Sequence, residues 1–288
     1  MSGAPDPNAV DATKEQSILT ETARTARSQK QSQAAGDAVL RTDKCTIRFG
    51  GLTAVKELDM NVRAGEIYGL IGPNGAGKTT VFNLLTGVYK PTSGEIYFEG
   101  KRIDGLRPYE IARRGVSRTF QNIRLFPGMS VLENVLTACH IHVKQSLLDA
   151  VLRTPRFARD ERENEDYCME LLSIFDLDRF KNEGGTSLPY GNQRRLEIVR
   201  ALATRPQLLL LDEPAAGMNP SEQEDLMSLI HQIRDRFGLT ILLVEHNMKV
   251  VMGVCERIQV VDYGKSIALG VPEEIKNDPK VIEAYLGD

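Results

Sequence analysis

One eight-residue segment narrows the possible folds of this 288-residue chain more than any other. It reads Gly72-Pro73-Asn74-Gly75-Ala76-Gly77-Lys78-Thr79 and fits the pattern GxxxxGK[ST] at every fixed position. The apolar run Ile67 to Ile71 precedes it, and the helix-forming residues Lys78 to Leu85 follow. In such a segment, glycines let backbone N–H groups turn toward phosphate oxygens, and the helix N-terminus adds positive potential. The segment therefore predicts a phosphate-binding loop between a strand and a helix.

The chemistry of this loop predicts a nucleotide site. We expect Lys78 to reach the β- and γ-phosphates of ATP and the hydroxyl of Thr79 to ligate Mg²⁺. The residues predicted to contact ATP in this region are Gly72, Pro73, Asn74, Gly75, Ala76, Gly77, Lys78, Thr79 and Thr80.

A second signal lies at the end of a leucine run. Leu208 to Leu211 predict a buried strand, and Asp212 and Glu213 follow it directly. We expect Asp212 to hold the hydration shell of the Mg²⁺ beside Thr79. Glu213 is predicted to be the general base that polarises a water against the γ-phosphate.

Two further residues follow predicted strands. His246 lies just beyond the apolar strand Thr240 to Val244, and we expect it to contact the γ-phosphate and orient the attacking water. Gln121 follows a predicted strand over Val116 to Phe120, where its amide can reach Mg²⁺ or that water. The predicted catalytic residues are thus Glu213, His246 and Gln121, and the predicted metal ligands are Thr79, Gln121 and Asp212.

The order of predicted elements indicates an α/β fold. Continuous apolar strands alternate with helices, which is typical of a mainly parallel sheet covered on both faces. Strands are also predicted at Cys45 to Phe49, Val55 to Val62 and Glu95 to Glu99, and a closing hairpin is predicted around Gly264. Few β signals occur between residues 122 and 192, so we expect a mainly helical insertion there.

The first part of the chain has a different composition. Residues 1–39 are rich in Ala, Ser, Thr and Gln and show no apolar periodicity, so we expect a disordered tail. A short helix over Ser17 to Arg27 is the alternative interpretation. The predicted domains are therefore a tail, residues 1–39, and one ATPase domain, residues 40–288, with its helical subdomain at about 122–192.

Charge, hydropathy and cysteine spacing exclude other classes of protein. The 36 Lys and Arg residues nearly balance the 39 Asp and Glu residues, which disfavours nucleic acid as a partner. The longest aliphatic runs are far shorter than the ~20 residues that span a bilayer, so we expect no membrane-spanning segment. Four scattered cysteines without a CxxC pair predict reduced thiols rather than a zinc site.

These motifs, in this order, resemble the nucleotide-binding subunits of ATP-binding cassette (ABC) transporters over residues 41–288. The resemblance implies a P-loop NTPase fold with a mainly parallel sheet core, a small antiparallel β subdomain and a helical signature subdomain. It includes a signature-like segment, Leu188 to Glu197, which in the family covers ATP bound by the opposite subunit. The residues matched to that role are Tyr190, Gly191, Asn192 and Gln193. Pro189, Tyr190 and Asn219 depart from the family's usual Ser, Gly and Asp.

Within this family, the chain is similar to the ATPase subunits of branched-chain amino acid importers, and to the larger of the two. The segments that carry this similarity include Arg48 to Val55, Leu152 to Pro155, Tyr190 to Glu197, Glu213 to Pro220, Glu245 to Met248 and Ala284 to Gly287. Phe49 matches the aromatic residue that stacks on adenine in the family, whereas a place in the core of the sheet is the alternative for this ring. The resemblance thus implies an ATPase that powers uptake of leucine, isoleucine and valine through nucleotide-driven dimer closure.

The same resemblance implies partners and a location. They are a second ATPase subunit (identical or different), two membrane permease subunits and, indirectly, an extracytoplasmic solute-binding protein, at the cytoplasmic face of the inner membrane. The surface from Asn122 to Met129 is expected to receive the permease. An importer for urea or short amides, an exporter-type cassette and a non-transport soluble ABC ATPase are the alternatives.

Overall fold

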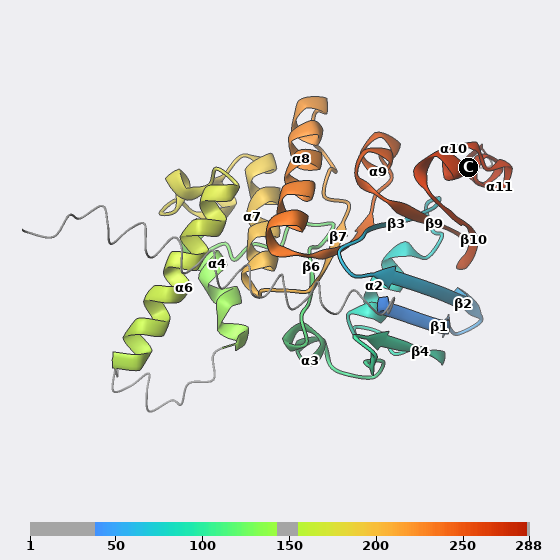
Figure 1. Cartoon of the computed structure of the whole chain (residues 1–288), viewed down its shortest axis with the longest axis horizontal. Coiled ribbons are helices and arrows are strands. Elements are labelled where there is room, and N and C mark those ends of the chain that lie inside the picture. The colour runs from blue at the N-terminus through green and yellow to red at the C-terminus, as the bar shows by residue number, and fades with distance from the viewer. Residues whose placement is uncertain (1–37, 143–154, 287–288) are drawn as a thin grey trace, which may run out of the picture.

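Two sheets form the framework of the computed structural model, which describes residues 38–142 and 155–286 (Figure 1). The larger sheet has six strands in the order β10-β9-β3-β8-β7-β6. All pairs in it are parallel except that between the last two strands of the chain, which form the hairpin predicted around Gly264. In chain order its strands are β3 (Ile67–Ile71), β6 (Val116–Arg118), β7 (Leu208–Asp212), β8 (Thr240–Val244), β9 (Arg257–Asp262) and β10 (Lys265–Gly270). The prediction of a mainly parallel sheet is confirmed.

The smaller sheet is antiparallel, with the order β2-β1-β4-β5. Its strands are β1 (Ala38–Phe49), β2 (Leu52–Arg63), β4 (Ser93–Phe98) and β5 (Lys101–Arg102). The first two strands are longer than predicted, because their pairing continues to Ala38 and Arg63 at one end and includes Leu52 at the other. β1 begins at Ala38, so the last two residues of the expected tail, Ala38 and Val39, belong to this strand. The rest of the expected tail, with the alternative helix, lies outside the described residues.

Side chains along the strands of the larger sheet point alternately to its two faces, and each face is covered by a separate hydrophobic core. Leu208 and Leu210 face the helix α2 (Lys78–Leu85) and the antiparallel sheet, whereas Leu209 and Leu211 face the opposite layer. Side chains of consecutive strand residues point to opposite faces, so a run of four buried leucines requires cover on both sides. The helices α7 (Tyr190–Ala203), α8 (Pro220–Phe237) and α9 (Met248–Val254) contribute to the second cover.

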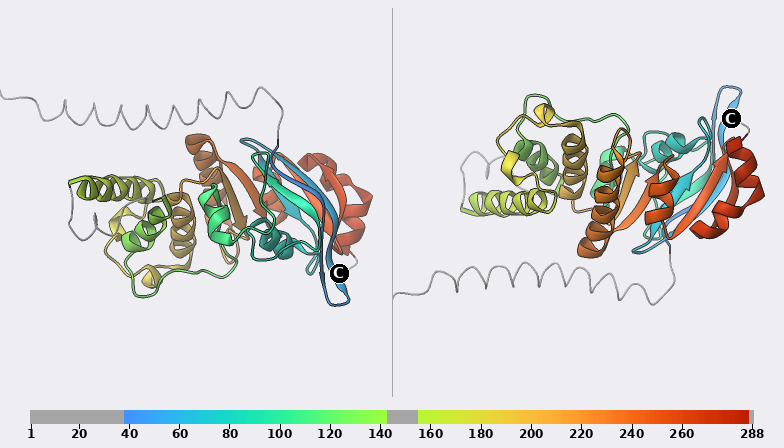
Figure 2. Two further views of the ribbon diagram at one scale, coloured as in Figure 1. Left: turned by 90° about the horizontal axis from the view of Figure 1, so that it is seen from below. Right: turned by 90° about the horizontal axis from the view of Figure 1, so that it is seen from above.

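A helical group extends the molecule at one end, opposite the two C-terminal helices (Figure 2). It contains α4 (Val131–Cys139), α6 (Pro155–Ile174) and the 3-10 turns η2 (His140–His142), η3 (Asp178–Phe180) and η4 (Gly185–Ser187). The remaining helices are α3 (Pro108–Arg113), α10 (Pro272–Asn277) and α11 (Pro279–Leu286). Residues 152–154 of the segment matched to the family lie outside the described residues, as does Gly287. None of the helices in the described ranges is long and apolar enough to cross a membrane.

The fold brings together two cysteines that are distant in the sequence. Cys139 on α4 and Cys168 on α6 are both buried, with their sulfur atoms 3.2 Å apart. All four cysteines are free and buried. The spacing of the cysteines in the sequence therefore did not indicate that Cys139 and Cys168 lie side by side in the helical group.

Candidate functional site

The glycine-rich loop follows β3, and two of its glycines are required by close packing. Gly72 has φ +154°, and a Cβ there would lie 1.9 Å from the carbonyl oxygen of Val261. Gly77 has φ +104°, and a Cβ there would lie 2.6 Å from the carbonyl oxygen of Ala54. A Cβ on Gly75 would meet nothing within 4 Å, so the loop is open on that side.

Lys78 is folded over this loop. Its Nζ donates to the carbonyl oxygens of Gly72 at 2.6 Å and Pro73 at 2.8 Å, and the side chain is buried. Thr79, the next residue, is exposed, and Thr80 is half-buried. The predicted phosphate ligand thus lies within the loop, and the predicted metal-binding hydroxyl lies beside it at the start of α2.

Gln121, Glu213 and His246 meet in one cluster. The Gln121 Nε2 donates to Glu213 Oε2 at 2.8 Å, and His246 Nδ1 lies 3.7 Å from the same oxygen. Glu213 has φ +48°, an uncommon conformation for a residue other than glycine, and its N–H donates to the Val244 carbonyl. The side chains of Gln121 and His246 therefore both approach the same oxygen of the Glu213 carboxylate.

This cluster and the glycine-rich loop lie at the same edge of the larger sheet. β3, β8, β7 and β6 are consecutive and parallel, so the residues that follow them meet at one edge. Those residues are the glycine-rich loop, His246, Glu213 and Gln121 respectively.

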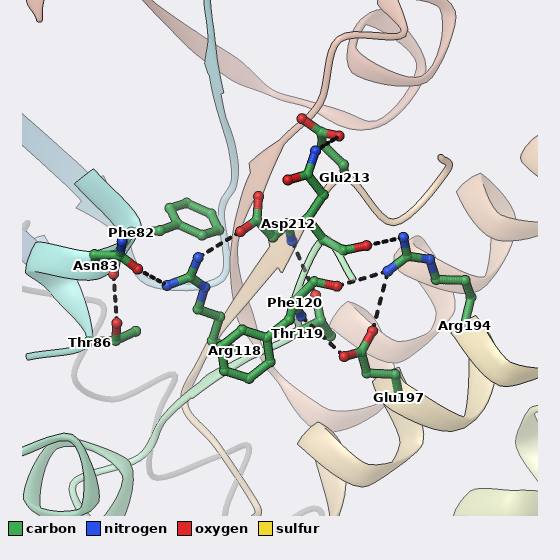
Figure 3. Close-up of polar contacts among 11 residues, drawn as sticks. Phe82, Asn83, Thr86, Arg118, Thr119, Phe120, Arg194, Glu197, Asp212 and Glu213 are labelled. Carbon is green, nitrogen blue, oxygen red and sulfur yellow. Dashed lines mark hydrogen bonds and ion pairs between the residues drawn. The ribbon is translucent and has the colours of Figure 1, made fainter. Parts of the chain in front are cut away.

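Asp212 at the end of β7 is buried and ion-paired. Arg118 Nη2 donates to Asp212 Oδ2 at 2.7 Å (Figure 3). Burial raises the pKa of Asp212, and the guanidinium of Arg118 opposes that shift. The Asp212 carboxylate thus lies at the same edge of the sheet as the glycine-rich loop, where it is paired with the guanidinium of Arg118.

The helix α7 holds the segment that leads from β6 to Gln121. Arg194 donates through Nη1 to the carbonyl of Phe120 at 2.8 Å and through Nη2 to the carbonyl of Gln121 (Figure 3). It also pairs with Glu197 at 3.4 Å, and Glu197 accepts from the Phe120 N–H. Burial raises the pKa of Glu197. A buried ion pair on α7 therefore positions the backbone of Gln121.

Glu245 organises the other side of the cluster. Its buried carboxylate accepts from the N–H groups of Ala215 at 2.7 Å, His246 at 3.1 Å and Asn247 at 3.3 Å. Burial raises the pKa of this carboxyl. One side chain thus ties the loop after Glu213 to the loop that carries His246.

The remaining predicted residues lie elsewhere. Phe49 is 44% exposed on the antiparallel sheet, with its ring edge-on to Tyr89 at 5.1 Å, so the alternative of a core position for Phe49 is wrong. Tyr190, Gly191, Asn192 and Gln193 form the first turn of α7. The Tyr190 hydroxyl accepts from Arg194, and the Gln193 amide donates to the Leu188 carbonyl at 2.7 Å. Two departures from the family pattern have local consequences: the Tyr190 ring packs on Gly217, and Asn219 caps α8 by accepting from Glu222 N–H.

Sequence reasoning assigned no role to Arg118, Arg194, Glu197 or Glu245. Arg118 lies within the strand predicted over Val116 to Phe120, and Glu245 directly follows the predicted apolar strand Thr240 to Val244. A charged side chain that is buried at such a position requires a partner. That requirement was the available signal for both residues. The fold shows which partner each one has.

Known proteins similar to this chain point to one family. A sequence model described as "ABC transporter" matches residues 55–216, and one described as "Branched-chain amino acid ATP-binding cassette transporter" matches residues 265–288. The branched-chain amino acid transport ATP-binding proteins BraF of Pseudomonas aeruginosa and LivG of Escherichia coli (strain K12) are 48% and 49% identical to it. Each match covers 87% of this chain and 98% of the relative. The lipopolysaccharide export ATP-binding protein LptB of Haemophilus influenzae is 34% identical over the same shares.

Solved structures agree with the sequence matches. The ADP conformation of MJ1267, an ATP-binding cassette of an ABC transporter, aligns with a TM-score of 0.76 at 31% identity, covering 87% of this chain and 99% of that one. A dimeric post-hydrolysis state of the cassette MJ0796, bound to ADP and Pi, aligns with a TM-score of 0.67 at 25% identity, covering 81% and 98%.

Proposed function

The chain belongs to the ATP-binding cassette family as an ATP-binding subunit of the branched-chain amino acid transporter type, and we propose that it hydrolyses ATP to drive uptake of leucine, isoleucine and valine. The observation that carries the catalytic part is the convergence of Gln121, Glu213 and His246 at the sheet edge of the phosphate loop. The identity of 48–49% to the two importer ATPases, against 34% to the lipopolysaccharide export protein, supports the cargo.

In the proposed reaction, the loop N–H groups and Lys78 bind the phosphates of ATP, and Phe49 stacks on adenine. Lys78 exchanges its contacts with the loop carbonyls for phosphate oxygens. Glu213 accepts a proton from the attacking water, and Gln121 and His246 orient that water. A positioned general base contributes typically about 10²–10⁴-fold to the rate.

The proposed metal site has the donor types that Mg²⁺ prefers. Thr79, Gln121 and Asp212 offer a hydroxyl, an amide oxygen and a carboxylate, which are hard oxygen ligands. The Gln121 amide nitrogen donates to Glu213, which directs the amide oxygen away from that contact. Mg²⁺ bound here together with ATP would neutralise the charge that develops on the phosphates.

The proposed working unit is a dimer of ATPase subunits, identical or different. Tyr190, Gly191, Asn192 and Gln193 would cover ATP held by the partner subunit, and the dimeric state of the MJ0796 cassette supports this arrangement. Pro189 replaces a hydroxyl donor, so the partner's phosphate would be bound mainly by backbone N–H groups at the start of α7.

We further propose that the dimer binds two membrane permease subunits at the cytoplasmic face of the inner membrane, while an extracytoplasmic binding protein delivers the cargo. The permease would contact residues 122–129, where Phe126 is exposed and the neighbouring Leu125 is buried. Residues 1–37 are proposed to be a tail outside the ATPase domain, which begins with β1 at Ala38 rather than at the expected residue 40.

The test of this function is uptake of labelled leucine, isoleucine and valine by cells that carry either the wild-type chain or Glu213→Gln. We expect uptake of these three to be lost at normal protein abundance, while uptake of an unrelated amino acid is unchanged. The strain should lack other importers for these amino acids. Normal uptake of all three amino acids by the Glu213→Gln strain would contradict the proposed cargo. Uptake of urea and short amides would then be measured.

A further inference from the structure

Arg118 is a buried arginine that bridges two elements of the proposed nucleotide site. From β6, its Nη2 donates to Asp212 Oδ2 and its Nη1 to Asn83 Oδ1, each at 2.7 Å (Figure 3). The side chain of Arg118 is 7% exposed and that of Asp212 is 3% exposed. The rings of Phe82 and Phe120 flank the guanidinium, with centroids at 5.3 and 5.2 Å.

The two ends of this bridge belong to the two sides of the proposed metal site. Asn83 lies on α2, the helix that starts with Lys78 and Thr79, whereas Asp212 ends β7. The guanidinium is planar and rigid, so two hydrogen bonds to it define the position of both partners. Thr119, the residue after Arg118, also binds Asp212: its Oγ1 accepts from the Asp212 N–H at 3.1 Å.

The ion pair leaves a defined part of Asp212 for a ligand. Arg118 engages Oδ2 only, so Oδ1 stays outside the pair. The Nε of Arg118 is buried and has no hydrogen-bond partner among the described residues, so the hydrogen bonds of the guanidinium are those to Asp212 and Asn83.

We propose that Arg118 is a positioning residue for the divalent cation that binds with ATP. It orients the Asp212 carboxylate and ties it to the helix that carries Thr79. This inference rests on the proposed roles of Thr79 and Asp212 as metal ligands. Groups that orient metal ligands typically contribute about 10–100-fold to metal affinity, so a loss of this size is expected without Arg118.

The charge of Arg118 alone predicts the opposite sign. A cation beside Asp212 repels Mg²⁺, so removal of a charge that did not position the carboxylate would strengthen metal binding. The direction of the change in Mg²⁺ affinity therefore distinguishes positioning from simple charge competition.

The experiment uses the full chain with Glu213→Gln as the common background, so that ATP is not consumed. Two quantities are measured by calorimetry: the affinity for ATP in EDTA, and the affinity of the ATP-bound protein for Mg²⁺. For Arg118→Gln we expect Mg²⁺ affinity to fall about 10–100-fold while metal-free ATP affinity stays unchanged. Arg41→Gln is the matched control, because Arg41 is also ion-paired and stacked on a ring but lies exposed on β1.

Two further variants keep the result decisive if Arg118→Gln does not fold. Asn83→Ala removes only the contact to α2, and Arg118→Lys retains the charge without the planar fork. Both are expected to weaken Mg²⁺ binding and to leave metal-free ATP binding intact. Unchanged or tighter Mg²⁺ binding in the folded variants would overturn the proposal, and so would an equal loss of metal-free ATP affinity. If the background protein itself showed no Mg²⁺-dependent ATP binding, the proposed function would fail instead.

Discussion

Replacement of Arg194 by methionine tests how strongly the buried ion pair on α7 stabilises the protein. The side chains of Arg194 and Glu197 are 4% and 2% exposed, so the substitution leaves a carboxylate in the interior without its cation. Removal of one partner of a buried pair typically costs about 3–5 kcal/mol of unfolding free energy. The carbonyls of Phe120 and Gln121 also lose their guanidinium donors, which places the expected loss at the upper end of this range.

This loss converts into a measurable change of melting temperature. For domains of 150–250 residues, 1 kcal/mol shifts the melting temperature by roughly 2–4 °C. With a loss near the upper end of the range, Arg194→Met is therefore expected to melt about 10–20 °C below the wild type. The matched control is Arg236→Met, because Arg236 pairs with Glu170 at the surface, and an exposed pair is worth about 0–1 kcal/mol.

A double-mutant cycle identifies the cause of the destabilisation. Thermal and urea unfolding are measured for Arg194→Met, Glu197→Leu and the double variant. Because two apolar side chains replace both charges, the double variant should be more stable than Arg194→Met alone. A loss below about 1 kcal/mol in Arg194→Met, or strictly additive single effects, would refute the reasoning.

Two other predictions concern the loop and the buried carboxylate of Glu245. Lys78→Ala should lose affinity for ATP in equilibrium titrations, because the only side-chain ammonium of the loop is removed; an unchanged dissociation constant would contradict the assignment. Burial raises the pKa of Glu245, so the native state holds its proton more tightly than the unfolded chain. The stability that this proton contributes is present below the ordinary Glu pKa of about 4.3 and is lost as pH rises through the raised value. Relative to Glu245→Gln, the wild type should therefore lose unfolding free energy as the pH rises above about 4. A difference between the two proteins that does not change with pH would contradict a raised pKa of Glu245.

The sequence predicts the sheet edge well, because its signals are local. A glycine-rich segment that follows an apolar strand must turn there, and Asp212 directly follows a run of leucines. Parallel strands then bring these turns to one edge, which is why Gln121, Glu213 and His246 could be grouped before the fold was known. Local signals were weaker at the ends of elements: β6 ends at Arg118 rather than Phe120, and β1 begins at Ala38 rather than Cys45.

The residues that hold this edge together could not be predicted, because each depends on a distant partner. Arg118 contacts Asp212 across 94 positions of the sequence, and Glu245 contacts Ala215 across 30. Two of the three N–H groups that donate to the Glu245 carboxylate belong to the next two residues, but nothing near Glu245 in the chain indicates the third donor, Ala215. These partners are determined by tertiary packing, which the pattern of residues within one segment does not predict.

The position of β3 has a consequence for the synthesis of the chain. Ile67 pairs with Ile241 and Tyr68 pairs with Arg257, so both neighbours of this strand come from the C-terminal end of the chain. At about 5–20 residues per second, a ribosome needs roughly 10–35 s to add these neighbours. During that interval the nascent strand, which has four hydrophobic side chains and one glycine, has no partner on either edge. The glycine-rich loop that follows β3 therefore lacks its neighbouring strands until residues 240–262 have been synthesised, so nucleotide cannot assist the folding of this loop before that point.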